Sequence, residues 1–127
     1  MVLRVMLVLV AAALLAGCGG GDDETREDKI ASCLKKDYGD FVSTERTDLD
    51  VLTAASMDGG ISVITEKNQV NISLHKTEDV AKKAVKIYEA GRAPPKKLER
   101  FGSAVVAYTA KPTAQDERTI ENCLKED

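Results

Sequence analysis

The chain contains few aromatic residues and only one histidine. Its 127 residues include no tryptophan, three tyrosines, two phenylalanines and a single histidine. A buried core must therefore consist mainly of isoleucine, valine, leucine and alanine. The only histidine is His75, which excludes zinc motifs built from two histidines. We expect His75 to be a surface residue at the end of a strand.

Other catalytic signatures are also missing from the sequence. The glycine-rich run at residues 19–21 does not lie between a strand and a helix, so it does not form a phosphate-binding loop. No Cys-x-x-Cys pair occurs, and no nucleophile-elbow sequence lies near His75. The net charge of −3 gives no nucleic-acid signal. We predict no catalytic residue, metal or cofactor, although the many carboxylates leave a pair for glycoside cleavage open.

The N-terminal segment has the three parts of a secretory signal. A positive start with Arg4 is followed by an apolar run over residues 5–16, and small residues close it. The run is about 12 residues long, whereas a helix needs about 20 to span a bilayer, so it is a signal segment rather than a stable span. The segment ends in Leu15-Ala16-Gly17-Cys18.

Residues 15–18 resemble the lipobox of bacterial lipoproteins: an aliphatic residue, a small residue, Gly or Ala, then Cys. The resemblance implies that the Cys18 thiol receives a diacylglyceryl group and that residues 1–17 are removed as a signal peptide. The protein would then be lipid-anchored to a bacterial membrane on its extracytoplasmic side. The residue after the cysteine is Gly19, which does not indicate which bacterial membrane holds the anchor. An ordinary signal peptide with a cysteine near its end by chance is the alternative.

The mature chain is long enough for one small domain. Residues 18–25 contain three adjacent glycines and an acidic run, which is typical of a flexible, solvated tether. Residues 26–127 then form a single domain. The sequence therefore divides into signal peptide, tether and domain.

Two cysteines remain in the domain, and an even number in an exported protein favours a disulfide. Cys33 and Cys123 lie in segments that share Ile, Cys and Leu at the same spacing. In a helix, positions i, i+3 and i+4 share one face, so each segment presents its cysteine beside apolar side chains. Packing the two faces together would bring the thiols close. A structural Cys33–Cys123 disulfide is favoured over a redox-active pair.

Periodicity and turn residues predict three helices and two hairpins. We expect helices from Thr25 to near Gly39, over residues 77–90, and from Thr113 through Cys123. The hairpins are expected over residues 61–66 with 70–75, and 97–101 with 104–109. Residues 39–47 look like a loop. Residues 48–57 are predicted to form a short helix, with an edge strand over 49–55 as the alternative.

These elements predict an α+β domain. Two hairpins, each followed by a helix, would form a four-stranded antiparallel sheet with the helices on one face. The disulfide would join the N-terminal helix to the C-terminal helix.

One stretch of the sequence is conspicuously basic and offers a contact for an anionic surface such as lipid headgroups or an acidic envelope polymer. Its members are Lys82, Lys83, Lys86, Arg92, Lys96, Lys97 and Arg100. A solvated helix face is the alternative. We expect a non-catalytic binding or interaction module of the envelope, whose partner is such a surface or another envelope protein. A small carboxylate-dependent enzyme and a structural or stress-related protein are the other possibilities.

Overall fold

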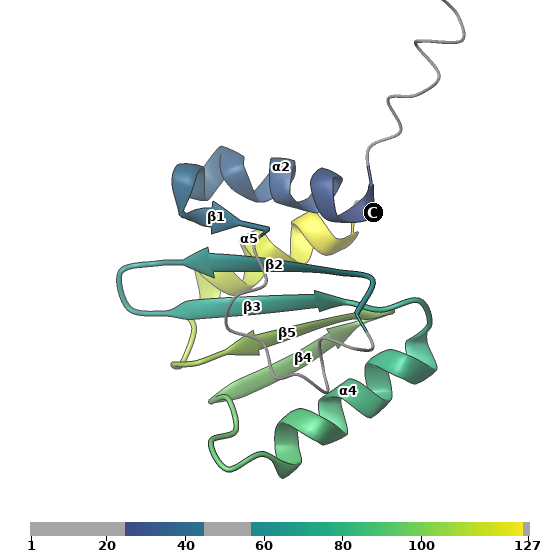
Figure 1. Ribbon diagram of the computed structural model, residues 1–127. Helices are drawn as coiled ribbons and strands as arrows, with labels where there is room; N and C mark the ends of the chain where they lie inside the picture. Colours follow the sequence, from purple (N-terminus) through teal and green to yellow (C-terminus); the bar gives the residue numbers. More distant parts are fainter. Residues whose placement is uncertain (1–24, 45–56, 126–127) are drawn as a thin grey trace, which may run out of the picture.

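The computed structural model describes residues 25–44 and 57–125 (Figure 1). This part of the chain contains three α-helices and five strands. Their order is α2 (Arg26–Tyr38), the 3-10 turn η1 (Gly39–Phe41), β1 (Val42–Ser43), β2 (Gly59–Ile64), β3 (Gln69–Leu74), α4 (Glu78–Ala90), β4 (Lys97–Phe101), β5 (Ala104–Tyr108) and α5 (Ala114–Lys125). The predicted signal segment, Cys18 and residues 48–56 of the predicted short helix or edge strand lie outside the described residues.

The strands form one antiparallel sheet in the order β1-β2-β3-β5-β4. The predicted α+β class and the two hairpins are confirmed, but the sheet has a fifth strand. That strand, β1, lies where we expected a loop. Val42 is buried and pairs with Val63 of β2. At two residues, β1 is too short to produce the alternating pattern by which strands are predicted.

The helices cover both faces of the sheet, so the prediction that they share one face was wrong. Ala104, Val106 and Tyr108 pack into the core that includes residues of α2 and α5. Val105 belongs to a second cluster with Ala81 of α4. Because successive side chains of a strand point to opposite faces, α4 lies opposite α2 and α5 (Figure 1). All five β5 residues are buried, as expected for a strand covered on both faces.

The predicted disulfide is confirmed and joins α2 to α5. Cys33 and Cys123 are bonded, with their Cα atoms 5.6 Å apart. Ile30 and Ile120 are buried in the same core cluster, as the shared spacing of the two segments indicated. Every member of both core clusters lies between Ile30 and Leu124. A chain that begins at residue 18 therefore contains all the described residues that hold the domain together.

Threonine side chains set the start of each helix. Thr25, Thr77 and Thr113 each accept a hydrogen bond from the backbone amide three residues later, at 3.1–3.2 Å. Such caps satisfy amide groups that the first helical turn leaves without partners. Gly39 follows α2 with a φ of 59°, a conformation that side chains with a Cβ rarely adopt. The predicted helix starts are thus correct to within a residue or two.

His75 is buried, so the prediction of a surface histidine was wrong. Its side chain is 1% exposed, and Nε2 lies 2.8 Å from Oγ of the fully buried Ser73. The backbone amide of His75 donates to the carbonyl of Ser103 in the β4–β5 turn at 2.9 Å. That bond extends the pairing of β3 with β5 beyond the end of β3. His75 therefore lies within the sheet's packing rather than on its rim.

Two tyrosines give a matched test of buried hydroxyl groups. The Tyr38 hydroxyl donates to Oδ1 of Asp116 at 2.7 Å and so ties α2 to the start of α5. The Tyr108 hydroxyl is buried, and within the described part of the chain no group bonds to it. We expect Tyr38→Phe to lower the free energy of unfolding by about 1 kcal/mol, and Tyr108→Phe to raise it by up to about 1 kcal/mol. Urea denaturation of both variants measures the difference.

The pH dependence of the Tyr38 effect provides a control. Burial, and then the hydrogen bond to Asp116, raise the pKa of Tyr38 above its usual value. A raised tyrosine pKa means that the folded state prefers the protonated hydroxyl. The stabilisation is therefore fully present below pH of about 10 and is lost as the pH rises further. An effect of Tyr38→Phe that grew above that pH would contradict the assignment.

Candidate functional site

A wide pocket opens at the end of the molecule where α2 starts and α5 ends. Its volume is about 850 Å³, and its walls come from the start of α2, the segment leading into α4, the β4–β5 turn and the last turn of α5. Four of its lining side chains are cationic and one is acidic: Arg26, Lys76, Arg100 and Lys125 against Glu78. We call this the basic pocket. Its charge is opposite in sign to the net charge of −3 of the whole chain.

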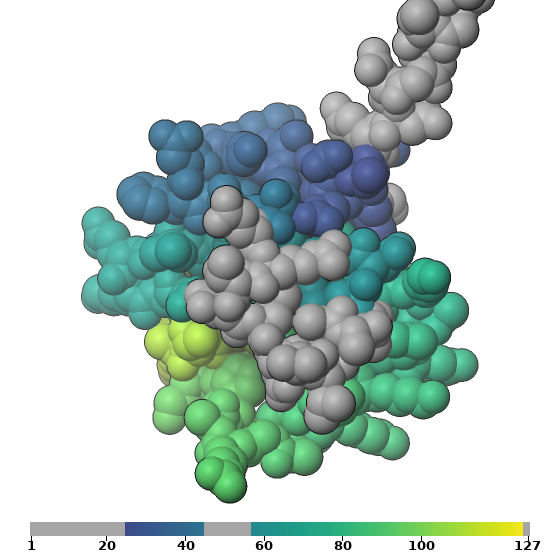
Figure 2. All heavy atoms as spheres, in the orientation of Figure 1, coloured from purple at the N-terminus to yellow at the C-terminus, as the bar shows by residue number. Residues whose placement is uncertain are grey.

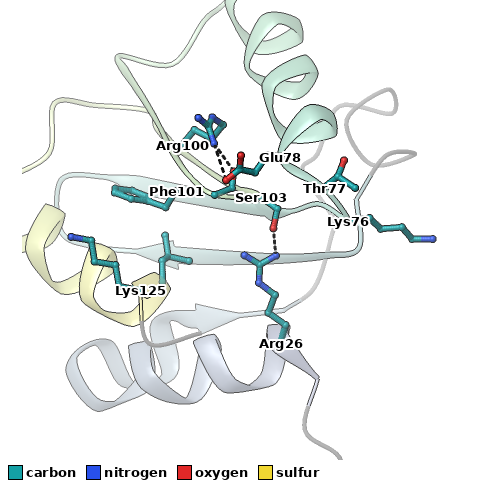
Figure 3. Close-up of a pocket in the computed structure, with 10 residues that line it drawn as sticks. Arg26, Lys76, Thr77, Glu78, Arg100, Phe101, Ser103 and Lys125 are labelled. Atoms are coloured by element: carbon teal, nitrogen blue, oxygen red, sulfur yellow. Dashed lines mark hydrogen bonds and ion pairs between the residues drawn. The ribbon is translucent and has the colours of Figure 1, made fainter.

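Two arginines of the basic pocket are held in place by neighbouring groups (Figure 3). Nη1 of Arg26 donates to Oγ of Ser103 at 2.7 Å and to the carbonyl oxygen of His75 at 3.5 Å. Nη1 of Arg100 donates to the carbonyl of Gly102 at 2.8 Å and lies 4.0 Å from a carboxylate oxygen of Glu78. The β4–β5 turn therefore positions both guanidinium groups.

Two lysines flank these arginines on opposite sides (Figure 3). Lys125 pairs with Glu121 one helical turn earlier at 2.7 Å, and its side chain is 64% exposed. Lys76 is exposed, and no ion pair with it occurs among the residues that the structure describes. Exposed ion pairs contribute little free energy, so both ammonium groups can reorient toward an anion at low cost.

The positive charge of the basic pocket comes from side chains rather than from the start of α4. The Thr77 hydroxyl already caps the amide of Val80, and Glu78 places a carboxylate in the first turn. Both features offset the partial positive charge that a helix start carries. The four cationic side chains are therefore the source of attraction for an anion.

The pocket also offers apolar surface beside its charges. Phe101 is partly buried and packs against the core, and Leu124 is 6% exposed. Both line the pocket, on the side of β4 and α5 respectively. A ligand with an anionic group and an adjoining apolar part would match both features.

The structure divides the basic stretch predicted from the sequence. Lys82, Lys86 and Arg100 line a groove of about 490 Å³ between α4 and β4, and Arg100 also lines the basic pocket. The other four members, Lys83, Arg92, Lys96 and Lys97, line none of the described pockets.

Lys97 lies on the other face of the sheet from the α4 lysines, because successive side chains of a strand point to opposite faces. Its ammonium group contacts the carboxylates of Glu117 and Glu99, the latter at 2.9 Å. The hydrogen bonds to Glu117 and then to Glu99 raise the pKa of Lys97. Glu117 belongs to α5, so Lys97 faces the side of the sheet opposite α4. It therefore adds little to an anionic contact near α4.

Sequence reasoning missed three of the four cations in the basic pocket. Arg26, Lys76 and Lys125 are far apart in the chain and form no charge cluster in the sequence. Their common feature is position: Arg26 starts α2, Lys76 lies just before α4, and Lys125 ends α5. Only the folded topology brings these three ends together.

Carboxylates form no cluster comparable to the four cations of the basic pocket in the described part of the chain. Glu89 and Glu99 both line the α4–β4 groove, but Glu99 is paired with Lys97. Over residues 25–44 and 57–125, no group of three or more His, Cys, Asp or Glu side chains is placed to hold a metal ion. In the same ranges, no helix combines the length and apolarity needed to cross a bilayer.

A third, smaller hollow of about 380 Å³ lies between the end of α2 and β2. It includes two exposed apolar side chains, Phe41 at 65% and Ile64 at 52% exposure, beside the acidic Asp37 and Glu66. The space-filling view shows the blue atoms of residues 25–44, which include α2 and β1, directly against the teal atoms of the β2–β3 hairpin (Figure 2). This hollow is apolar and acidic, in contrast to the basic pocket.

Comparison with protein-family models, with curated proteins and with solved structures found no match for this chain. A function must therefore be inferred from the residues themselves. The basic pocket is the feature with the clearest ligand chemistry, because it is lined by hydrogen-bonded guanidinium groups, exposed ammonium groups and apolar surface.

Proposed function

We propose that this protein is a lipoprotein of the bacterial envelope whose domain is a non-catalytic module that binds an anionic ligand in the basic pocket. The observation that carries the proposal is that four cationic side chains line one pocket in a chain of net negative charge. The anchor is the diacylglyceryl group on Cys18, and the domain works on the extracytoplasmic side of the membrane.

Two features support this location. The lipobox at residues 15–18 supplies the lipidation signal, and two acyl chains give stable membrane attachment where one does not. The disulfide between Cys33 and Cys123 suits an oxidising compartment outside the cytoplasm. Both features are independent of the ligand.

The groups around the basic pocket support binding rather than catalysis. Its two hydroxyl side chains already have structural roles: Thr77 caps α4, and Ser103 accepts the hydrogen bond from Arg26. Its one carboxylate, Glu78, faces Arg100. Cations held in place, with the one neighbouring carboxylate facing Arg100, are suited to holding an anion.

The remaining alternatives rest on weaker observations. A carboxylate enzyme would use Glu89 and Glu99, one of which is already paired with Lys97. A structural or stress-related protein requires no pocket. An anionic contact at the α4 lysines, Lys82, Lys83 and Lys86, remains a second prediction.

A titration with tripolyphosphate tests the proposed binding. The protein is the chain 18–127 carrying Cys18→Ser, which is exported so that the disulfide forms. Lys76→Gln/Lys125→Gln removes two exposed charges from the pocket. We expect about fivefold weaker binding, on the basis of about 0.5 kcal/mol per exposed charge. Calorimetry measures the affinity at low salt.

Two matched variants remove the same charge elsewhere. Lys35→Gln/Lys36→Gln lies on exposed positions of α2, and Lys82→Gln/Lys83→Gln on exposed positions of α4. Neither should weaken binding as much as the pocket variant. Absence of tripolyphosphate binding to the unsubstituted pocket would refute the proposed function, and a selective loss in the α4 variant would move the site to α4.

A further inference from the structure

The basic pocket lies at the end of the domain where the described chain begins, a few residues after Cys18. Arg26 is the first residue of α2 and lines the pocket. Only eight residue steps separate it from Cys18, and an extended chain spans at most about 3.6 Å per residue. The pocket therefore stays within about 30 Å of the lipidated sulfur, about the thickness of the hydrocarbon core of a bilayer.

Because the pocket stays close to the membrane, phosphate groups at the membrane surface have a high effective concentration at the pocket. A short flexible linker holds its two ends at an effective concentration in the millimolar range. Anionic phospholipids also give a membrane a negative surface potential that attracts basic residues. A weak site for a lipid phosphate would therefore be filled when the protein is anchored.

The chemistry of the pocket matches a lipid headgroup better than a small inorganic anion. Arg26 and Arg100 are positioned by the β4–β5 turn, and guanidinium groups suit phosphate oxygens. Phe101 and Leu124 place apolar surface beside them, where the glycerol and first acyl carbons of a lipid would lie. Lys76 and Lys125 flank the site and reach toward neighbouring phosphates.

We propose that the basic pocket binds the phosphate group of an anionic phospholipid in the same membrane that holds the lipidated Cys18. This inference rests on the proposed function and names its ligand. It gives the domain a second attachment point, so that the basic pocket faces the bilayer. The hollow at Phe41 and Ile64 is formed by other elements.

Binding of the unanchored chain to vesicles tests this proposal. The chain 18–127 with Cys18→Ser is mixed with vesicles of phosphatidylcholine alone, or with an equal mixture of phosphatidylcholine and phosphatidylglycerol, and sedimented. We expect binding only to the mixed vesicles. Lys76→Gln/Lys125→Gln should weaken it about 30-fold, since each basic residue near such a surface contributes about fivefold in affinity. The α2 variant Lys35→Gln/Lys36→Gln should bind like the parent chain.

The outcomes separate this inference from the proposed function. Binding of tripolyphosphate without binding to mixed vesicles would overturn the lipid proposal and leave the anion-binding function standing. Failure of both probes would overturn both. Tighter binding to a lipid-free polyglycerol phosphate than to mixed vesicles would assign the pocket to an envelope polymer instead.

The acidic run at residues 22–24 precedes Arg26 in the sequence and is the alternative occupant that must be tested. The variant Asp22→Asn/Asp23→Asn/Glu24→Gln tests it. If this variant alone binds mixed vesicles and the parent chain does not, the pocket belongs to the tether and the lipid proposal is wrong. If both bind, the lipid proposal stands.

Discussion

Loss of the Cys33–Cys123 disulfide is expected to lower the free energy of unfolding by about 4 kcal/mol. The bond joins residues 90 positions apart. In the chain-entropy model, a closed loop of this length restricts the unfolded ensemble strongly. The same bond holds α2 against α5, whose apolar faces share the main core. A loss of this size corresponds to a melting temperature lower by roughly 15 °C or more.

The double variant Cys33→Ala/Cys123→Ala measures this effect without leaving a free thiol. Its melting temperature in oxidising buffer should match that of the reduced unsubstituted protein. Reductant should have no effect on the variant, which serves as the control. If reductant leaves the melting temperature of the unsubstituted protein unchanged, the disulfide does not stabilise the domain.

Cys18→Ser is expected to move the protein from the detergent phase to the aqueous phase of a detergent partition. Serine lacks the sulfur on which we propose the diacylglyceryl group, so the variant would have no acyl chains. The apolar run at residues 5–16 cannot replace them, because about 12 residues are too few for a stable span. The change should be close to complete, since two acyl chains account for stable attachment.

Cys33→Ala/Cys123→Ala provides the matched cysteine control for partitioning. Its lipobox is intact, so it should remain in the detergent phase even though its domain is less stable. Equal partitioning of Cys18→Ser and the unsubstituted protein would show that attachment does not depend on Cys18.

The parts of the fold that followed from the sequence are those with local signals. The hairpin that contains β3 and the helix starts at Thr77 and Thr113 follow from alternation and capping residues, which act over a few positions. The disulfide followed because Cys33 and Cys123 lie in helical segments of the same pattern. These features need no knowledge of how distant elements pack.

The errors concern contacts between distant segments. β1 is two residues long and is defined by its pairing with β2. One sequence signal indicated that α4 lies opposite α2 and α5. The residues of β5 are continuously apolar, a pattern typical of strands buried on both faces. His75 is buried through contacts with Ser73 and Ser103, one of them far along the chain.

The candidate site shows the same division. Arg100 was predicted because it belongs to a dense basic stretch. Arg26, Lys76 and Lys125 stand alone in the sequence and line one pocket only because three helix ends lie at the same end of the sheet. Charge clustering along a chain therefore detects surfaces made by one element, but not pockets made by several.

The mass of the N-terminal peptide of the native protein, purified from membranes, tests the central claim most directly. We expect a peptide that begins at Cys18 and carries the added mass of a diacylglyceryl group. A peptide that begins at Met1, or a Cys18 terminus without lipid, would contradict the proposed anchor and with it the position of the basic pocket at the membrane.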